Sequence, residues 1–89
     1  MAEKRIAKWR RGEWCRRIYE YKGQKREAQG YEMDFILNGQ IQASFVAVPD
    51  WDRQVLKLRG CIVWRYAHYV PKTRELPFGV DNKEFEIEV

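Results

Sequence analysis

Residues 31–45, YEMDFILNGQIQASF, hold two runs of alternating apolar and polar residues on either side of Asn38-Gly39. Alternation with a period of two is typical of strands that bury one face. An Asn-Gly pair between two such runs is a strong signal for a tight hairpin turn. The stretch therefore predicts two antiparallel strands joined at Asn38-Gly39.

Two registers are open for this hairpin. A two-residue loop would pair Phe35 with Gln42 and Met33 with Ser44, which mixes apolar and polar side chains on each face. A three-residue loop, residues 37–39, gathers one apolar face and puts Gly39 at the left-handed position of a type I turn with a G1 bulge. We therefore predict the three-residue loop, with the pairs Phe35–Ile41, Met33–Ala43 and Tyr31–Phe45.

Two further segments predict strands without ambiguity. Residues 84–89 alternate between three carboxylates and the apolar Phe85, Ile87 and Val89, which is typical of a half-buried strand. Residues 61–70 are apolar on both faces and rich in aromatic and β-branched residues, so they predict a central strand. Its rings, Trp64, Tyr66 and His68, are expected in the core.

Two other segments fit more than one structure. Residues 50–60 show helical spacing behind Asp50 as an N-cap, but the alternation within 54–59 favours a strand. Residues 14–21 carry apolar positions on one helical face, yet Gly12 and the content of Trp and Tyr favour extended chain. A turn is expected at residues 22–24, leading into the strand that contains Tyr31.

Counting residues 14–21 as a strand gives five or six strands in meander order. We therefore predict a mostly β fold, a small and strongly bent antiparallel sheet or barrel in the size range of SH3-like and OB-like modules. The alternative is an α+β fold with an amino-terminal helix. The 89 residues suffice for a single small domain, with residues 1–12 as a candidate flexible basic arm.

Positive charge is concentrated in the first third of the chain. Residues 1–30 hold ten Lys and Arg against four Glu, whereas residues 31–89 hold seven against nine Asp and Glu. Such segregation predicts a polyanion or an acidic partner. Tryptophans are interleaved with these cations; cations displace counterions from phosphates, and exposed rings stack on unpaired bases.

We therefore expect a non-catalytic module that binds DNA or RNA phosphates with little sequence specificity. Trp9 is the expected stacking ring, because charged residues flank it on both sides. The alternative is a protein-interaction module, a small inhibitor or accessory subunit, that docks an acidic partner surface. Homo-oligomers are also conceivable, through the acidic carboxyl-terminal strand of one copy and the basic region of another. The expected contact residues are Lys8, Trp9, Arg10, Arg11, Arg16, Arg17, Lys22, Lys25 and Arg26.

Catalytic and metal-binding patterns are missing from the sequence. Cys15, Cys61 and His68 are far apart, whereas structural zinc sites usually contain a close-spaced pair. The chain has no glycine-rich phosphate loop, GxSxG elbow or HExxH motif. We therefore expect no enzyme activity, metal or cofactor.

No apolar run reaches the roughly 20 residues of a membrane span, and without a secretory signal the cysteines predict reduced thiols in a cytoplasmic protein.

Overall fold

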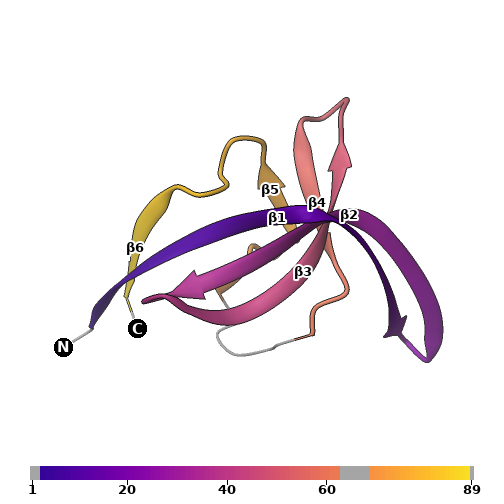
Figure 1. The fold of residues 1–89 in the computed structure, drawn as a ribbon, viewed down its shortest axis with the longest axis horizontal. Helices are drawn as coiled ribbons and strands as arrows, with labels where there is room; N and C mark the ends of the chain where they lie inside the picture. Colours follow the sequence, from indigo (N-terminus) through magenta and orange to yellow (C-terminus); the bar gives the residue numbers. More distant parts are fainter. Residues whose placement is uncertain (1–2, 63–68, 89) are drawn as a thin grey trace.

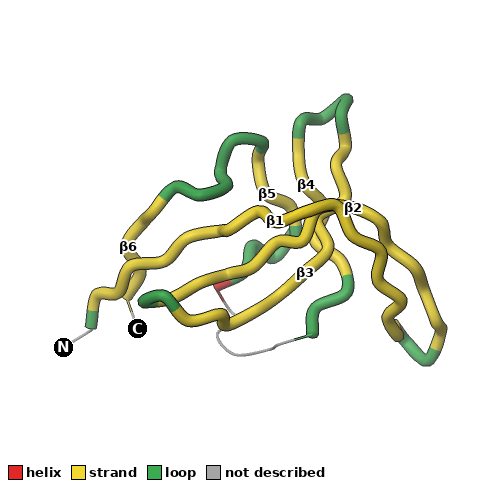
Figure 2. Tube along the Cα trace, viewed as in Figure 1, coloured by secondary structure: helices red, strands yellow, loops and turns green. Residues whose placement is uncertain are grey.

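The computed structural model describes residues 3–62 and 69–88, and most of them belong to one antiparallel sheet. The sheet order is β5-β4-β3-β2-β1-β6, so β6 returns to the free side of β1. Figures 1 and 2 show that the sheet curls into a half-barrel. The strands are β1 (Lys4–Tyr21), β2 (Gln24–Leu37), β3 (Gln40–Asp50), β4 (Val55–Arg59), β5 (Glu75–Pro77) and β6 (Glu84–Glu88).

The predicted bent, mostly β fold is confirmed, and the alternative amino-terminal helix is wrong because that segment is β1. Residues 4–12, considered above as a flexible arm, form the first half of this strand. Of these residues, Ala7–Arg11 pair with β2 on one edge and Lys4–Lys8 pair with β6 on the other. Ala7 and Trp9 alternate with Lys8 and Arg10, so this half of β1 has one apolar face that packs into the core.

The core lies on one face of the central strands. Met33, Phe35 and Leu37 of β2 share this face with Ala43 and Phe45 of β3. Strands β4 and β5 add three leucines to the same cluster: Leu56, Leu58 and Leu76. The other face of β2 and β3 is covered as well, since Ile36 and Val46 are buried. Burial on both faces identifies β2 and β3 as the centre of the sheet.

The turn between β2 and β3 differs from the prediction. Leu37 pairs with Gln40, so Asn38-Gly39 is a two-residue loop, and both residues have positive φ, 49° and 81°, as a type I′ turn requires. A β-bulge then makes Gln42 an extra residue, which places it between the pairs Ile36–Ile41 and Phe35–Ala43. The predicted three-residue loop is therefore wrong, and the observed pairs are Phe35–Ala43, Met33–Phe45 and Tyr31–Ala47.

Three other predicted elements can be compared with the structure. The strand favoured over residues 54–59 is confirmed as β4, and the carboxyl-terminal strand is confirmed as β6. The predicted central strand over residues 61–70 is not seen at Cys61, Ile62, Tyr69 or Val70. Residues 63–68, with Trp64, Tyr66 and His68, lie outside the described residues.

The β1–β2 pair continues well beyond the other strands (Figure 1). A bulge at Gly12-Glu13 separates the pair Arg11–Met33 from the pair Trp14–Tyr31. Beyond this bulge the two strands pair residue for residue up to the turn at Lys22-Gly23, where φ is 50° and 75°. The turn predicted at residues 22–24 is thus confirmed. We call residues 14–31 the hairpin arm.

Besides the strand pair Tyr31–Ala47, two contacts attach the hairpin arm to the half-barrel. A β-carbon added to Gly30 would overlap the carbonyl oxygen of Ala47 and lie 2.6 Å from its carbonyl carbon, so the backbone of β3 can approach only a glycine here. Arg17 supplies the second attachment: its Nη1 donates to the carbonyl oxygens of Gly60 at 2.6 Å and Ser44 at 3.2 Å. The arm therefore has a fixed position relative to β3 and the end of β4.

Candidate nucleic-acid interface

Trp9 is a core residue and not a stacking ring. Only 3% of it is exposed, and its ring centroid lies 5.1 Å from that of Phe35 and 6.0 Å from that of Phe45. The expectation that Trp9 is exposed because charged residues flank it is wrong. In a strand, neighbouring side chains point to opposite faces. A ring between two exposed cations therefore points away from them and into the core.

The other predicted contacts in the first half of β1 face carboxylates of the same chain. Arg10 Nη2 lies 3.0 Å from Oδ2 of the buried Asp34, its cross-strand neighbour in β2. Arg11 Nε lies 3.4 Å from Asp81, and its guanidinium is 4.9 Å from the centroid of the Tyr31 ring. Their positive charge is therefore largely balanced within the fold.

The acidic strand β6 also offsets part of the positive charge of β1. Its residues Glu84 and Glu88 are the register partners of Lys8 and Lys4 in β1. Opposite charges across a strand pair stabilise it by roughly 0.2–1 kcal/mol. Two of the three carboxylates of β6 thus lie opposite basic residues of their own chain, and Glu86 lies opposite Ile6.

Two predicted arginines lie within the hairpin arm but have structural partners. Arg16 Nε is 2.8 Å from Glu27 Oε1 across the arm. Arg17 is committed to the carbonyl oxygens of Ser44 and Gly60, as described above. A guanidinium that already satisfies two backbone acceptors is a brace for the fold. We therefore remove Arg17 from the candidate contact residues.

The end of the hairpin arm holds the remaining predicted cations. Lys22 Nζ and Arg26 Cζ each lie 5.4 Å from the centroid of the Tyr21 ring, and Tyr21 is 51% exposed. Lys25 is exposed on β2. In the part of the chain that the structure describes, these three cations form no ion pair with a carboxylate. We call Tyr21, Lys22, Lys25 and Arg26 the arm tip.

Sequence reasoning missed Trp14 and Tyr21 as exposed rings of the arm. Trp14 is 55% exposed and touches Tyr31 edge-on, with centroids 5.2 Å apart. The signal that could have found them is the length of β1. At about 3.3 Å per residue, a strand of 18 residues is too long to be covered by the core of so small a domain, so its far half must be exposed.

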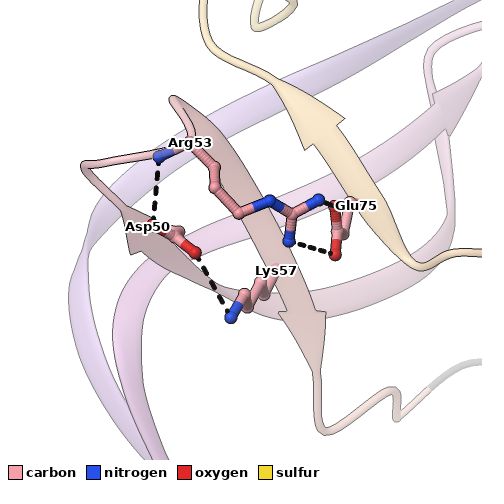
Figure 3. Close-up of polar contacts among 4 residues, drawn as sticks. All are labelled: Asp50, Arg53, Lys57 and Glu75. Atoms are coloured by element: carbon pink, nitrogen blue, oxygen red, sulfur yellow. Dashed lines mark hydrogen bonds and ion pairs between the residues drawn. The ribbon is translucent and has the colours of Figure 1, made fainter.

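A separate polar cluster at the β3–β4 turn is structural (Figure 3). Arg53 makes a two-pronged contact with Glu75, at 3.0 and 2.8 Å. The backbone N–H of Arg53 donates to Asp50 at 3.2 Å and is the main reason why the pKa of Asp50 falls below its usual 3.8, with Lys57 at 3.4 Å acting in the same direction. Each of these four charged groups has a partner, so the cluster ties the turn to β5.

Candidate metal ligands and membrane-spanning helices were sought among the described residues. Across residues 3–62 and 69–88, no three His, Cys, Asp or Glu side chains gather where they could hold a metal ion. Cys15 and Cys61 form no disulfide. Within those same ranges, the fold contains no helix long and apolar enough to cross a membrane.

No protein-family model, curated protein or solved structure matches the chain. The arm carries five Lys and Arg against two Glu, and it extends away from the rest of the half-barrel (Figure 1). Near the base of the arm, Arg17 binds backbone carbonyl oxygens of the half-barrel and Arg16 pairs with Glu27. The cations of the arm tip form no ion pair in the described part of the chain.

Proposed function

We propose that this protein is a non-catalytic nucleic-acid-binding module that contacts phosphates with its arm tip. The observation that carries the proposal is the segregation of the cations by partner. Arg10, Arg11 and Arg16 make ion pairs with carboxylates, whereas Lys22, Lys25 and Arg26 are exposed and make no ion pair in the described part of the chain; Lys22 and Arg26 lie beside the exposed ring of Tyr21. Cations that are not compensated within the fold are the ones that can release counterions from a nucleic acid.

The shape of the arm supports the same function. A two-stranded antiparallel ribbon fits into the major groove of B-form DNA, and several DNA-binding proteins place such a ribbon there. The arm tip offers mainly cationic groups, which bind phosphate oxygens and carry little information about base identity. The expected complex therefore has strong salt dependence and low sequence specificity.

Removing two charges from the arm tip tests this function. The variant Lys25→Ala/Arg26→Ala should bind oligonucleotides about tenfold or more weakly at low salt. The slope of log affinity against log salt should become shallower by about 2, because each lost phosphate contact removes about 0.9 from the slope on B-form DNA. Fluorescence anisotropy with labelled single- and double-stranded oligonucleotides, titrated at several salt concentrations, measures both quantities.

The matched control removes the same charge elsewhere. Lys72 and Lys83 are exposed and lie outside the arm, so Lys72→Ala/Lys83→Ala should leave the salt slope nearly unchanged. Equal losses in the two double variants would contradict a site at the arm tip, since they would reflect net charge alone. Absence of binding by the wild type at low salt would contradict the function itself.

The ring of Tyr21 distinguishes single-stranded from duplex ligands. If bases stack on this ring, Tyr21→Ala should weaken single-strand binding by about 1–3 kcal/mol and leave duplex binding almost unaltered. Tyr21→Phe keeps the ring and its contacts with Lys22 and Arg26, so its affinity should match the wild type. The same anisotropy titrations report both variants, and a loss in Tyr21→Phe as large as in Tyr21→Ala would show that the hydroxyl, not stacking, matters.

Docking of an acidic protein surface is the second candidate function. The observation that favours it is the exposure of Trp14 and Tyr21 close to the arginines of the arm, since Trp, Tyr and Arg dominate the binding energy of protein interfaces. The anisotropy experiment separates the two functions. A protein that binds neither strand form at low salt, yet binds an acidic protein, would have the second one.

A further inference from the structure

The hairpin arm has an unpaired strand edge. Among the described residues, β6 covers β1 only over Lys4–Lys8, and residues 14–21 pair with β2 alone. This edge has no bulge and no proline. It displays Trp14, Ile18 and Tyr21 at 55, 62 and 51% exposure. Native proteins usually cover or interrupt such an edge, because its free N–H and C=O groups recruit another strand.

The charges along this edge have an order that suits a second copy of the chain. Trp14, Arg16, Ile18 and Glu20 share one face, because alternate side chains of a strand point the same way. Ile18 thus lies midway between a cation and an anion. Two copies of the strand that pair antiparallel would oppose Arg16 of each to Glu20 of the other, with Ile18 against Ile18.

Few other registers are possible for two β1 strands that pair antiparallel, because alternate side chains of a strand point to opposite faces of the sheet. A two-fold axis perpendicular to the sheet keeps each face continuous, so only residues of the same face can lie opposite one another. An axis at Arg16, Arg17 or Glu20 would oppose that charge to itself. An axis at Tyr19 would oppose Arg16 to Lys22. An axis further toward the amino terminus would meet the bulge at Gly12-Glu13 and leave few residues to pair.

We propose that the protein forms a symmetric dimer in which the β1 edges of two hairpin arms pair antiparallel about Ile18. The two half-barrels then share one continuous sheet, and the interface contains two Arg16–Glu20 ion pairs. Arg16 also keeps Glu27 at 2.8 Å, and Glu20 keeps Lys25 as its register partner in β2. Each interface charge therefore lies between groups of the opposite sign.

Charge reversal tests the dimer and its register together. Arg16→Glu and Glu20→Arg each place two like-charged pairs across the interface, so each should raise the dimer dissociation constant about tenfold or more. The double variant Arg16→Glu/Glu20→Arg restores opposite charges across the interface and should dimerise more tightly than either single variant, although Glu27 and Lys25 then face like charges within each arm. Sedimentation equilibrium over a concentration series measures all four proteins, and circular dichroism verifies that the exposed substitutions leave the fold intact.

A wild type that remains monomeric at millimolar concentration would overturn the proposal. So would a dimer that the single charge reversals do not weaken, since its interface would lie elsewhere. A double variant as weak as the singles would overturn the register, because the reversed residues would not face each other.

Disulfide trapping gives an independent readout of the two-fold axis. In a Cys15→Ser/Cys61→Ser background, Ile18→Cys should form an intermolecular disulfide under mild oxidation, because opposite residues in a strand pair approach the separation that a disulfide needs. Glu20→Cys in the same background is the matched control, since it would face Arg16. Equal cross-linking of the two variants would reflect random collision and would contradict the axis at Ile18.

Discussion

The Trp9→Ala variant should lose about 4 kcal/mol of unfolding free energy, the usual cost of truncating a large buried ring to alanine. Trp9 is 3% exposed and contacts the rings of Phe35 and Phe45, so the truncation would leave a cavity where β1, β2 and β3 meet. Small domains are stable by only about 5–15 kcal/mol in total. The variant is therefore expected to lose a large share of its stability and to unfold at a much lower urea concentration than the wild type.

Urea denaturation followed by far-ultraviolet circular dichroism measures this loss. Trp14→Ala is the matched control, because the same side chain is 55% exposed there and its edge-on contact with Tyr31 is worth about 1 kcal/mol or less. Similar midpoints for the two variants would contradict the placement of Trp9 in the core. Trp9→Phe, which keeps a ring in the core, should retain oligonucleotide binding if Trp9 does not contact the ligand.

The strands that could be predicted from the sequence are those whose pattern is local. The alternation of β6 and the turn residues Lys22-Gly23 and Asn38-Gly39 act within a few positions, and each appears in the structure where it was expected. The bent, mostly β fold follows from such elements, because short alternating strands joined by tight turns leave few other arrangements.

The two bulges could not be predicted, and they decide which residues face the core. A bulge adds one residue to one strand and shifts the alternation beyond it. After Leu37 pairs with Gln40, the extra residue Gln42 leaves Ile41 48% exposed and becomes buried itself. No local pattern marks such a position, since it depends on how two strands fit together. The predicted register therefore failed although Asn38 and Gly39 were correctly placed in the turn.

For the candidate site, too, the features that depend on nearby residues could be predicted, and those that depend on residues distant in the sequence could not. The excess of Lys and Arg in the first third of the chain was evident from composition. Which of these cations remain available depends on carboxylates far away in the sequence: Asp34 for Arg10 and Asp81 for Arg11. Sequence spacing cannot reveal those pairs, because the curl of the sheet creates them. The proposed contact surface is therefore only the part of the predicted set that lies at the arm tip, Lys22, Lys25 and Arg26.

Gly30→Ala is expected to be the most damaging substitution of a single small residue in the described part of the chain. Its β-carbon would overlap the carbonyl oxygen of Ala47 and lie 3.0 Å from the α-carbon of Val48. Both obstacles belong to the backbone of β3, and a backbone in the centre of a sheet cannot move aside as a side chain can. We expect a loss of about 3 kcal/mol of unfolding free energy, at the upper end of the usual cost of overpacking.

Gly12→Ala is the matched control for this prediction, because it adds the same atom to the same strand pair. Its β-carbon would lie 3.3 Å from Cβ of Glu32, a contact that a shift of a few tenths of an ångström relieves, so the expected loss is about 1 kcal/mol or less. Urea denaturation compares the two variants. Hydrogen exchange of the arm adds a second measure, since β3 displaced from Gly30 would also pull Ser44 away from Arg17 and release the arm. Equal stability of the two variants would mean that β3 does not lie against Gly30, and the attachment of the arm to the half-barrel would have to be explained by Arg17 and the Tyr31–Ala47 pair.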